Sequence, residues 1–165
     1  MKDLRVTLIQ SHLHWEEPEA NLAMFEEMIR PLVNQTDVII LPEMFTTGFS
    51  MRAPQLAEHM NMRTTRWMRQ MADHTDALLL GSFIAKVHER YYNRLIWMEP
   101  GGTVRTYDKR HLFRMSNEHL VYAPGESLLI GHWKGWNICP LVCYDLRFPV
   151  WSRNRWQASS QSMMY

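Results

Sequence analysis

The first half of the chain alternates between two hydrophobic periods, and this alternation restricts the fold more than any other feature. Residues 4–10 are rich in β-branched side chains and predict a strand. In residues 22–33 the apolar positions recur at helical spacing; Pro18 suits the first turn, and Pro31 is expected to bend the last. Residues 37–41 form a short apolar run, as in a strand covered on both faces. The pattern predicts a β-α-β unit at this end of the chain.

The alternation continues, which indicates the α/β class. Residues 64–74 predict a second helix, and residues 77–84 predict a second buried strand. Residues 108–125 have no clean period, so we expect a long loop there, and loops of this length are often functional. The remaining strands, of which the first two form a hairpin joined by a Pro-Gly-Gly turn, are expected at residues 91–98, 103–107, 127–130 and 136–142.

Composition excludes several classes of protein. The 165 residues carry 18 basic and 17 acidic side chains, and 46% of them are hydrophobic, which is enough for one packed domain. No basic stripe is present, which argues against nucleic acid or an anionic membrane as a partner. The apolar runs are far shorter than the roughly 20 residues of a membrane-spanning helix. Residues 1–11 lack the long apolar region of a signal peptide, so we expect a cytoplasmic protein.

Cys143 stands where a predicted strand meets helix-compatible residues. A cysteine at such a corner can act as a nucleophile, with backbone N–H groups of the next turn directed at an oxyanion. It can equally be a small buried hydrophobic residue, and the local pattern leaves both interpretations open.

A nucleophilic thiol needs a base and a cation nearby. Glu43 follows the apolar run 37–41, and Lys109 follows the predicted strand 103–107. A solvated glutamate and a surface lysine are the alternative interpretations. The carboxyl ends of strands are where open α/β sheets place their sites, and Glu43, Lys109 and Cys143 all follow such ends.

Metal binding has little support. His12 and His14 have a chelating spacing but no evident third ligand, and Cys139 with Cys143 is two ligands short of a zinc site. We therefore expect no metal, and we interpret Cys139 as a packed core residue.

Three segments carry a resemblance: Leu-Pro-Glu-Met-Phe at 41–45, Tyr-Asp-Lys-Arg-His-Leu-Phe at 107–113 and Cys-Tyr-Asp-Leu-Arg-Phe-Pro at 143–149. They resemble, in order, the three signature segments of the nitrilase superfamily of carbon–nitrogen hydrolases. The resemblance implies a hydrolase domain over residues 1–154, built as a four-layer α-β-β-α sandwich that forms homodimers. Residues 155–165 are predicted to form a polar, disordered tail.

The resemblance also implies roles for individual residues. Cys143 would be acylated, Glu43 would be the general base, and Lys109 would stabilise the tetrahedral intermediate. Glu118 matches a second family glutamate that helps to orient the site, and the backbone N–H of Tyr144 would help to hold the oxyanion. No organic cofactor or metal is implied.

Residues 108–119 most resemble the ω-amidase branch, which hydrolyses the terminal amide of small 2-oxo-dicarboxylate monoamides such as 2-oxoglutaramate. Phe45 and Phe113 are candidate walls of the substrate pocket, as is Tyr144. The side chains that could bind a substrate carboxylate are Arg110, Arg114 and Arg147, although Arg147 could instead pair with Asp145.

Family members continue beyond the point that residue 154 matches, so the fold is expected to be truncated at its C-terminal side. We expect the truncation to leave one face of the strand at 77–84 uncovered and a sheet edge unpaired. Two alternatives to an ω-amidase follow: a catalytically silent homologue, and a superfamily member that acts on nitriles or N-carbamoyl groups.

Overall fold

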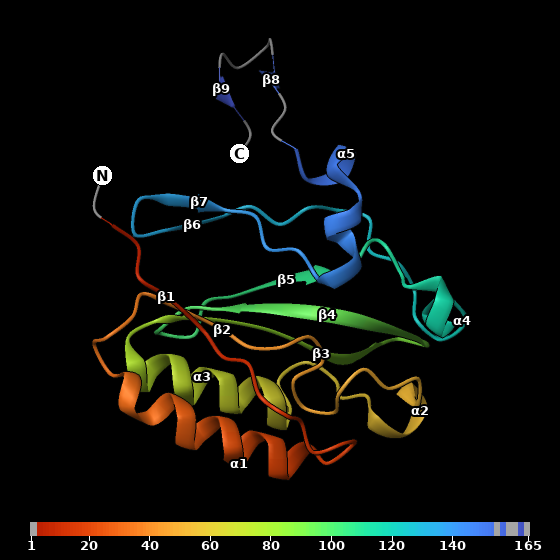
Figure 1. Cartoon of the computed structure of the whole chain (residues 1–165), viewed down its shortest axis with the longest axis horizontal. Helices are drawn as coiled ribbons and strands as arrows, with labels where there is room; N and C mark the ends of the chain where they lie inside the picture. Colours follow the sequence, from red (N-terminus) through yellow and green to blue (C-terminus); the bar gives the residue numbers. More distant parts are fainter. Residues whose placement is uncertain (1–2, 154–155, 158–161, 164–165) are drawn as a thin grey trace.

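A five-stranded mixed sheet organises the molecule (Figure 1). The computed structural model describes residues 3–153, 156–157 and 162–163. In spatial order the strands are β1 (Val6–Leu8), β2 (Val38–Ile40), β3 (Leu78–Val87), β4 (Arg90–Met98) and β5 (Val104–Asp108). The first three are parallel, and β4 is antiparallel to both β3 and β5. Strand β5 therefore runs in the same direction as β1 to β3, and the carboxyl ends of these four strands share one edge.

Helices α1 (Pro18–Ile29) and α3 (Arg63–Thr75) cover one face of the sheet (Figure 1). The predicted β-α-β unit is confirmed, with Val6 paired to Val38 across parallel strands. Pro18 lies in the first turn of α1, and Pro31 lies in the 3₁₀ helix η1 (Arg30–Leu32) that follows it. A proline lacks the N–H that an α-helix needs at this point, which explains the change of helix type.

Apolar side chains fill the core between the helices and the sheet. Phe25 and Met68 from the helices meet Leu79 and Ile96 from the strands, and all four side chains are fully buried. Burying each such side chain contributes roughly 1.5–3 kcal/mol. The alternation of side chains along a strand sends Leu78 and Leu80 to the opposite face.

The segment after residue 126 covers this opposite face. It includes the hairpin of β6 (Gly131–Trp133) and β7 (Trp136–Ile138). A Cβ on Gly131 would lie 2.3 Å from the Trp97 ring, so only glycine allows this close approach. The expectation that the strand at 77–84 has an uncovered face is therefore wrong: residues 78–85 are buried throughout.

The hairpin also corrects the strands predicted at 127–130 and 136–142. Lys134 and Gly135 both have positive φ, of 47° and 91°, and form the two-residue connection between β6 and β7. A two-residue connection of this kind sets the register between the two strands that it joins. Residues 127–130 and 139–142 have no strand assignment and run over the sheet as extended chain.

Short helices interrupt the loops, and the sequence indicated only the one that begins at Cys143. The predicted loop 108–125 contains the 3₁₀ helix η2 (Arg114–Ser116) and α4 (Glu118–Val121), and α2 (Ala53–Leu56) follows the Glu43 loop. The 3₁₀ helix η3 (Cys143–Arg147) and α5 (Pro149–Ser152) come after the covering segment.

The predicted tail 155–165 lies partly outside the described residues. Its described part is the antiparallel pair β8 (Trp156–Gln157) and β9 (Ser162–Met163). No helix in the described part of the chain is long and apolar enough to span a membrane.

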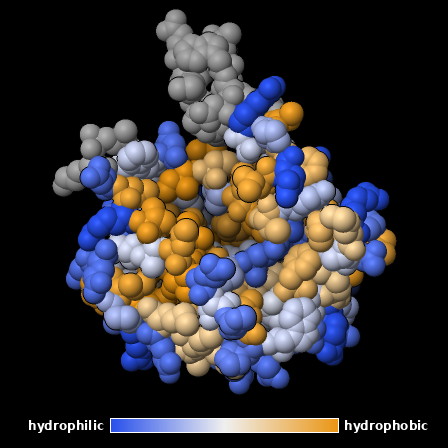
Figure 2. Space-filling model, in the orientation of Figure 1, coloured by the Kyte–Doolittle hydropathy of each residue, from blue (hydrophilic) through white to orange (hydrophobic). Residues whose placement is uncertain are grey.

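The layers agree with the expected α/β class. The described residues form one helical layer, the five-stranded sheet, and the β6–β7 hairpin beyond it. On the hairpin side, no described helix exceeds five residues. Strand β1 is an edge strand, and its Val6 and Leu8 are 48% and 72% exposed. Figure 2 shows apolar side chains gathered around the hollow between the sheet and the hairpin.

Candidate active site

The topology brings Glu43 and Lys109 together, although they are far apart in the sequence. Glu43 lies in the loop after β2, and Lys109 is the first residue after β5. These strands run in the same direction, so both residues emerge at one edge of the sheet. The Glu43 loop is held against β3, because the Met44 N–H donates to Ser82 Oγ at 2.9 Å and the Phe45 N–H donates to the Ser82 carbonyl at 3.0 Å.

The Lys109 ammonium bridges two carboxylates. Lys109 Nζ lies 2.7 Å from Glu43 Oε1, and 3.1 and 3.0 Å from the two Glu118 oxygens. The side chains of Lys109 and Glu118 are fully buried, whereas Glu43 keeps 21% of its side-chain surface exposed. A buried charge is stable only when it is paired and hydrogen-bonded, and this cluster meets both conditions. Of the two acids, only Glu43 is open to a reactant.

The electrostatics keep Lys109 protonated. Burial by itself lowers the pKa of the Lys109 ammonium, but the charges and hydrogen bonds of Glu43 and then Glu118 outweigh it, so the net shift is upward. The Phe49 ring lies 5.1 Å from Nζ and adds a cation–π contact. The ammonium is therefore a fixed positive charge beside the Glu43 carboxylate.

Asn93 completes this cluster, and the sequence analysis missed it. The Asn93 Nδ2 group donates to Glu43 Oε1 at 2.8 Å and to Glu118 Oε1 at 3.3 Å. The backbone carbonyl of Asn93 accepts the backbone N–H of Lys109 at 3.0 Å. Asn93 is 1% exposed and lies in β4. The available signal was an amide within the strand predicted at 91–98, because an unpaired polar side chain is costly wherever a strand is buried.

Cys143 occupies a strained turn at the start of η3. Its φ is +46°, in the left-handed region that non-glycine residues rarely adopt, and Val142 before it is extended. Such strain persists where the surroundings enforce the conformation. Cys143 and Tyr144 are the first residues of this 3₁₀ helix, so their N–H groups have no acceptor within it.

Buried Asp145 holds this turn in place. Its carboxylate accepts the Tyr107 hydroxyl at 2.7 Å, the His111 N–H and Nδ1 at 2.8 Å each, and the Val142 N–H at 3.2 Å. Asp145 thus joins the Cys143 turn to β5 and the segment after it. The expected pair of Arg147 with Asp145 is wrong, because the carboxylate points inward while Arg147 is exposed.

The Cys143 thiol lies beside Glu43. The residue is exposed, which excludes a buried structural cysteine, and it shares a small cavity of about 80 Å³ with Glu43 and Ser82. Burial of part of the thiol raises its pKa, the nearby Glu43 carboxylate raises it further, and Lys109 opposes the shift. The resting sulfur is therefore a neutral thiol next to a carboxylate that can take its proton. Cys139 is half-buried and lies outside this cavity.

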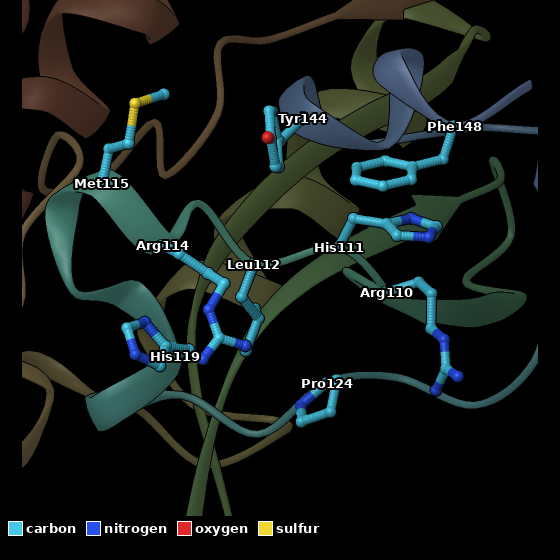
Figure 3. A pocket seen from close by; sticks show the side chains of 9 residues that line it. All are labelled: Arg110, His111, Leu112, Arg114, Met115, His119, Pro124, Tyr144 and Phe148. Carbon is cyan, nitrogen blue, oxygen red and sulfur yellow. The ribbon is translucent and has the colours of Figure 1, made fainter.

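A larger open pocket of about 610 Å³ adjoins this cavity (Figure 3). Tyr144 and Phe148 form one wall, and their rings meet edge-to-face with centroids 5.3 Å apart. Phe113 meets Tyr144 edge-to-face at 5.1 Å. Arg114 lines the pocket, as the sequence suggested for a substrate-binding residue.

Phe45 is placed differently from the sequence expectation. Its ring is fully buried on the helical side of the sheet, 5.8 Å from the rings of Phe25 and Trp67. It packs against the backbone of Gly81, where a Cβ would lie 3.0 Å from it. Phe45 is therefore a core residue that supports the Glu43 loop, and the prediction that it forms a pocket wall is corrected. Adjacency in sequence misled here because successive residues point in different directions.

In the part of the chain that the structure describes, no three His, Cys, Asp or Glu side chains converge as a metal site would require. The hydrogen-bonded group of Glu43, Lys109, Glu118 and Asn93, with the Cys143 thiol beside it, brings together an acid, a cation and a nucleophile in the described molecule.

Comparison with known proteins shows the family to which the chain belongs. The model of the carbon–nitrogen hydrolase family matches residues 5–157, and the chain belongs to this family. In the crystal structure of XC1258 from Xanthomonas campestris, a protein of the same superfamily with an arsenic adduct in its active site, the fold superposes with a TM-score of 0.93 at 46% identity. That comparison covers 96% of this chain and 60% of XC1258.

Two relatives that are named as amidases match most of this chain. The chain is 48% identical over 156 residues to the omega-amidase YafV of Escherichia coli K12, covering 93% of this chain and 59% of the relative. It is 28% identical over 151 residues to the 2-oxoglutaramate amidase of Bacillus subtilis, covering 90% of this chain and 58% of that enzyme. The chain thus spans about three-fifths of the length of these relatives.

Proposed function

We propose that this protein hydrolyses the terminal amide of a small 2-oxo-dicarboxylate monoamide, such as 2-oxoglutaramate, through a cysteine thioester. The observation that carries the proposal is the Glu43–Lys109–Glu118 cluster beside the exposed Cys143 thiol. Similarity to the omega-amidase of E. coli and the 2-oxoglutaramate amidase of B. subtilis supports the substrate class.

In the proposed acylation step, the Cys143 sulfur attacks the amide carbon while Glu43 takes the thiol proton. The thiol pKa is raised and the carboxylate lies beside it, so proton transfer and attack are coupled. The carbonyl oxygen gains the electron pair of the broken π bond. The Lys109 ammonium and the Tyr144 N–H stabilise that oxyanion, and preorganised donors of this kind commonly supply the largest single contribution to catalysis.

Collapse of the intermediate breaks the carbon–nitrogen bond. Glu43 returns its proton to the departing nitrogen, so ammonia leaves and a thioester remains on Cys143. Glu43 then takes a proton from water, the resulting hydroxide attacks the thioester carbon, and the proton returns to the sulfur. The balance is one amide and one water consumed, and one acid and one ammonia formed. Lys109, Glu118 and Asn93 hold Glu43 at a constant position through both halves.

We also propose, on the family resemblance, that the protein works as a homodimer, and that it does so in the cytoplasm. Its partner is a small-molecule amide and not nucleic acid or a membrane. The near-neutral charge of +1 supports this part of the proposal.

The test is ammonia release from 2-oxoglutaramate by the wild-type protein and by Cys143→Ala, with iodoacetamide labelling read by mass spectrometry. We expect turnover that the variant loses, and labelling that favours Cys143 over Cys139. Turnover of a nitrile or an N-carbamoyl compound in place of the amide would reassign the substrate. No turnover, with equal labelling of the two cysteines, would contradict the proposal and favour the catalytically silent homologue.

A further inference from the structure

We propose that Arg114 binds the carboxylate of the substrate, at the end distant from the scissile amide, and thereby selects anionic amides over neutral ones. The inference rests on the proposed amidase function. It assigns a specificity-determining residue and a binding site, the 610 Å³ pocket whose lining includes Tyr144, the residue after Cys143.

The pocket has the charge that an anion requires. Its lining includes two arginines, Arg110 and Arg114, and two histidines, His111 and His119, and no acidic side chain is among its lining residues. The aromatic rings of Tyr144 and Phe148 form its apolar part. A ligand with a short carbon chain and a terminal carboxylate has the matching chemistry, because guanidinium groups bind carboxylates through paired hydrogen bonds.

The structure distinguishes among the three arginines that the sequence offered as candidates to bind a substrate carboxylate. Arg110 is already engaged: its Nη1 donates to the Gly125 carbonyl at 2.9 Å, and its guanidinium lies 5.5 Å from the Trp151 ring. Arg147 is exposed and does not line this pocket.

Arg114 lines the pocket, yet within the described part of the chain its guanidinium makes no hydrogen bond or ion pair. In Figure 3 its side chain extends from η2 toward His119 of α4. The His119 Nδ1 atom is buried and also has no hydrogen-bond partner among the described residues. The two side chains line the same pocket: Arg114 is exposed, so its guanidinium is open to a ligand, and the buried His119 Nδ1 is the kind of polar atom that a hydrogen bond normally satisfies.

The backbone next to Arg114 is attached to the catalytic candidates. The N–H of its neighbour Phe113 donates to Glu118, which also binds Lys109. The Phe113 ring packs against Tyr144, the residue after Cys143. The backbone that carries Arg114 and the turn that carries Cys143 are thus both attached to this cluster, and we expect the site to select ligand length as well as charge.

The experiment compares 2-oxoglutaramate with 4-oxopentanamide, in which a methyl group replaces the carboxylate. Arg114→Met is expected to raise KM for the anionic amide roughly 10- to 100-fold, as the loss of a charge-assisted hydrogen-bond pair does. Hydrolysis of the neutral amide should stay within about twofold, because its ground state makes no ionic contact. Arg114→Lys should recover part of the loss, since it keeps the charge without the planar fork. The matched control is Arg147→Met, an exposed arginine outside the pocket.

A second measurement keeps the inference independent of turnover. Calorimetric binding of 2-oxoglutarate, the expected product, is compared between wild type, Arg114→Met and Arg147→Met. Binding that weakens about tenfold or more in Arg114→Met alone supports the inference even where neither amide is hydrolysed, an outcome in which only the proposed function fails. Wild-type protein that does not bind the dicarboxylate, or an Arg114→Met variant that binds and hydrolyses it as wild type does, overturns the inference while leaving the amidase proposal to its own test.

Discussion

The Lys109 cluster and the Cys143 turn lie side by side but are built in opposite ways. Lys109 and Glu118 have no exposed surface, and their contacts come from the loop after β2, from β4, from the residue after β5 and from α4. Cys143 is exposed, has a strained backbone and begins a helix of only five residues. The charge-bearing groups are thus fixed by several elements, whereas the nucleophile depends on one short turn anchored by Asp145. If this contrast holds, damage to the Lys109 cluster should mainly reduce stability, and damage to the Cys143 turn should mainly reduce activity.

Removing the positive charge of Lys109 should have the largest effect, and the quantity affected is the free energy of unfolding. Lys109→Met leaves the buried Glu118 and the partly exposed Glu43 without the cation between them, and breaking a buried pair costs about 3–5 kcal/mol of unfolding free energy. Urea denaturation checks this. The matched control is Lys134→Met, which breaks an ion pair with Asp37 whose lysine is 42% exposed and should cost about 0–1 kcal/mol. Equal losses in the two variants would show that the cluster is not the stabilising element described here.

Loosening the nucleophile turn should reduce activity more than stability. Asp145→Asn keeps the shape of the side chain but replaces one acceptor oxygen with a donor, which conflicts with the N–H and O–H groups that face it. A displacement of about 1 Å at a reacting group can lower the rate about 100-fold. We expect a loss of that order in kcat, measured as ammonia release, with a cooperative unfolding transition retained. An Asp145→Asn variant with wild-type kcat would mean that the turn holds its own shape.

The thiol titration tests the contact between the two regions. Partial burial and the Glu43 carboxylate both raise the Cys143 pKa. Alkylation needs the thiolate, so its rate should rise with pH and reach its midpoint above that of an unperturbed thiol. Glu43→Gln removes the negative charge and should move the midpoint to lower pH, giving faster iodoacetamide labelling at a fixed pH near 8. Cys139 in the same sample is the internal control, because Glu43 does not contribute to its raised pKa.

We expect the smallest effect on activity and stability from removing one of the several hydrogen-bond donors to Asp145. Tyr107→Phe removes one of the donors to Asp145 and leaves the donors of His111 and Val142. The variant also removes the acceptor of the Trp151 Nε1–H group, which lies 3.2 Å from the Tyr107 hydroxyl. Each lost hydrogen bond costs about 1 kcal/mol, and we expect kcat to fall less than tenfold. Thermal unfolding and ammonia release measure both. An effect as large as that of Asp145→Asn would identify the tyrosine hydroxyl as the principal anchor of the turn.

Much of the fold could be predicted because its signals are local. Periodicity located α1, α3 and the strands β1 to β5, and the prolines at 18 and 31 marked both ends of the first helix. The β6–β7 hairpin was misplaced because its Lys134-Gly135 connection is a weak turn signal, and a few extended residues can satisfy the same pattern. The covered second face of β3 was missed for a different reason: it depends on where a distant segment folds back, which no local window contains.

For the site, the sequence by itself determined the chemical groups: a cysteine at a corner, an acid and a lysine after strands, and the family motifs that contain them. Only the tertiary structure decided which groups meet. It brought Asn93 into the cluster, sent Phe45 to the core, turned Asp145 away from Arg147 and left Arg114 without a partner among the described residues. The physical reason is that residue types and local periods are properties of short segments, whereas burial and pairing depend on strand order and on how loops cross a shared sheet edge.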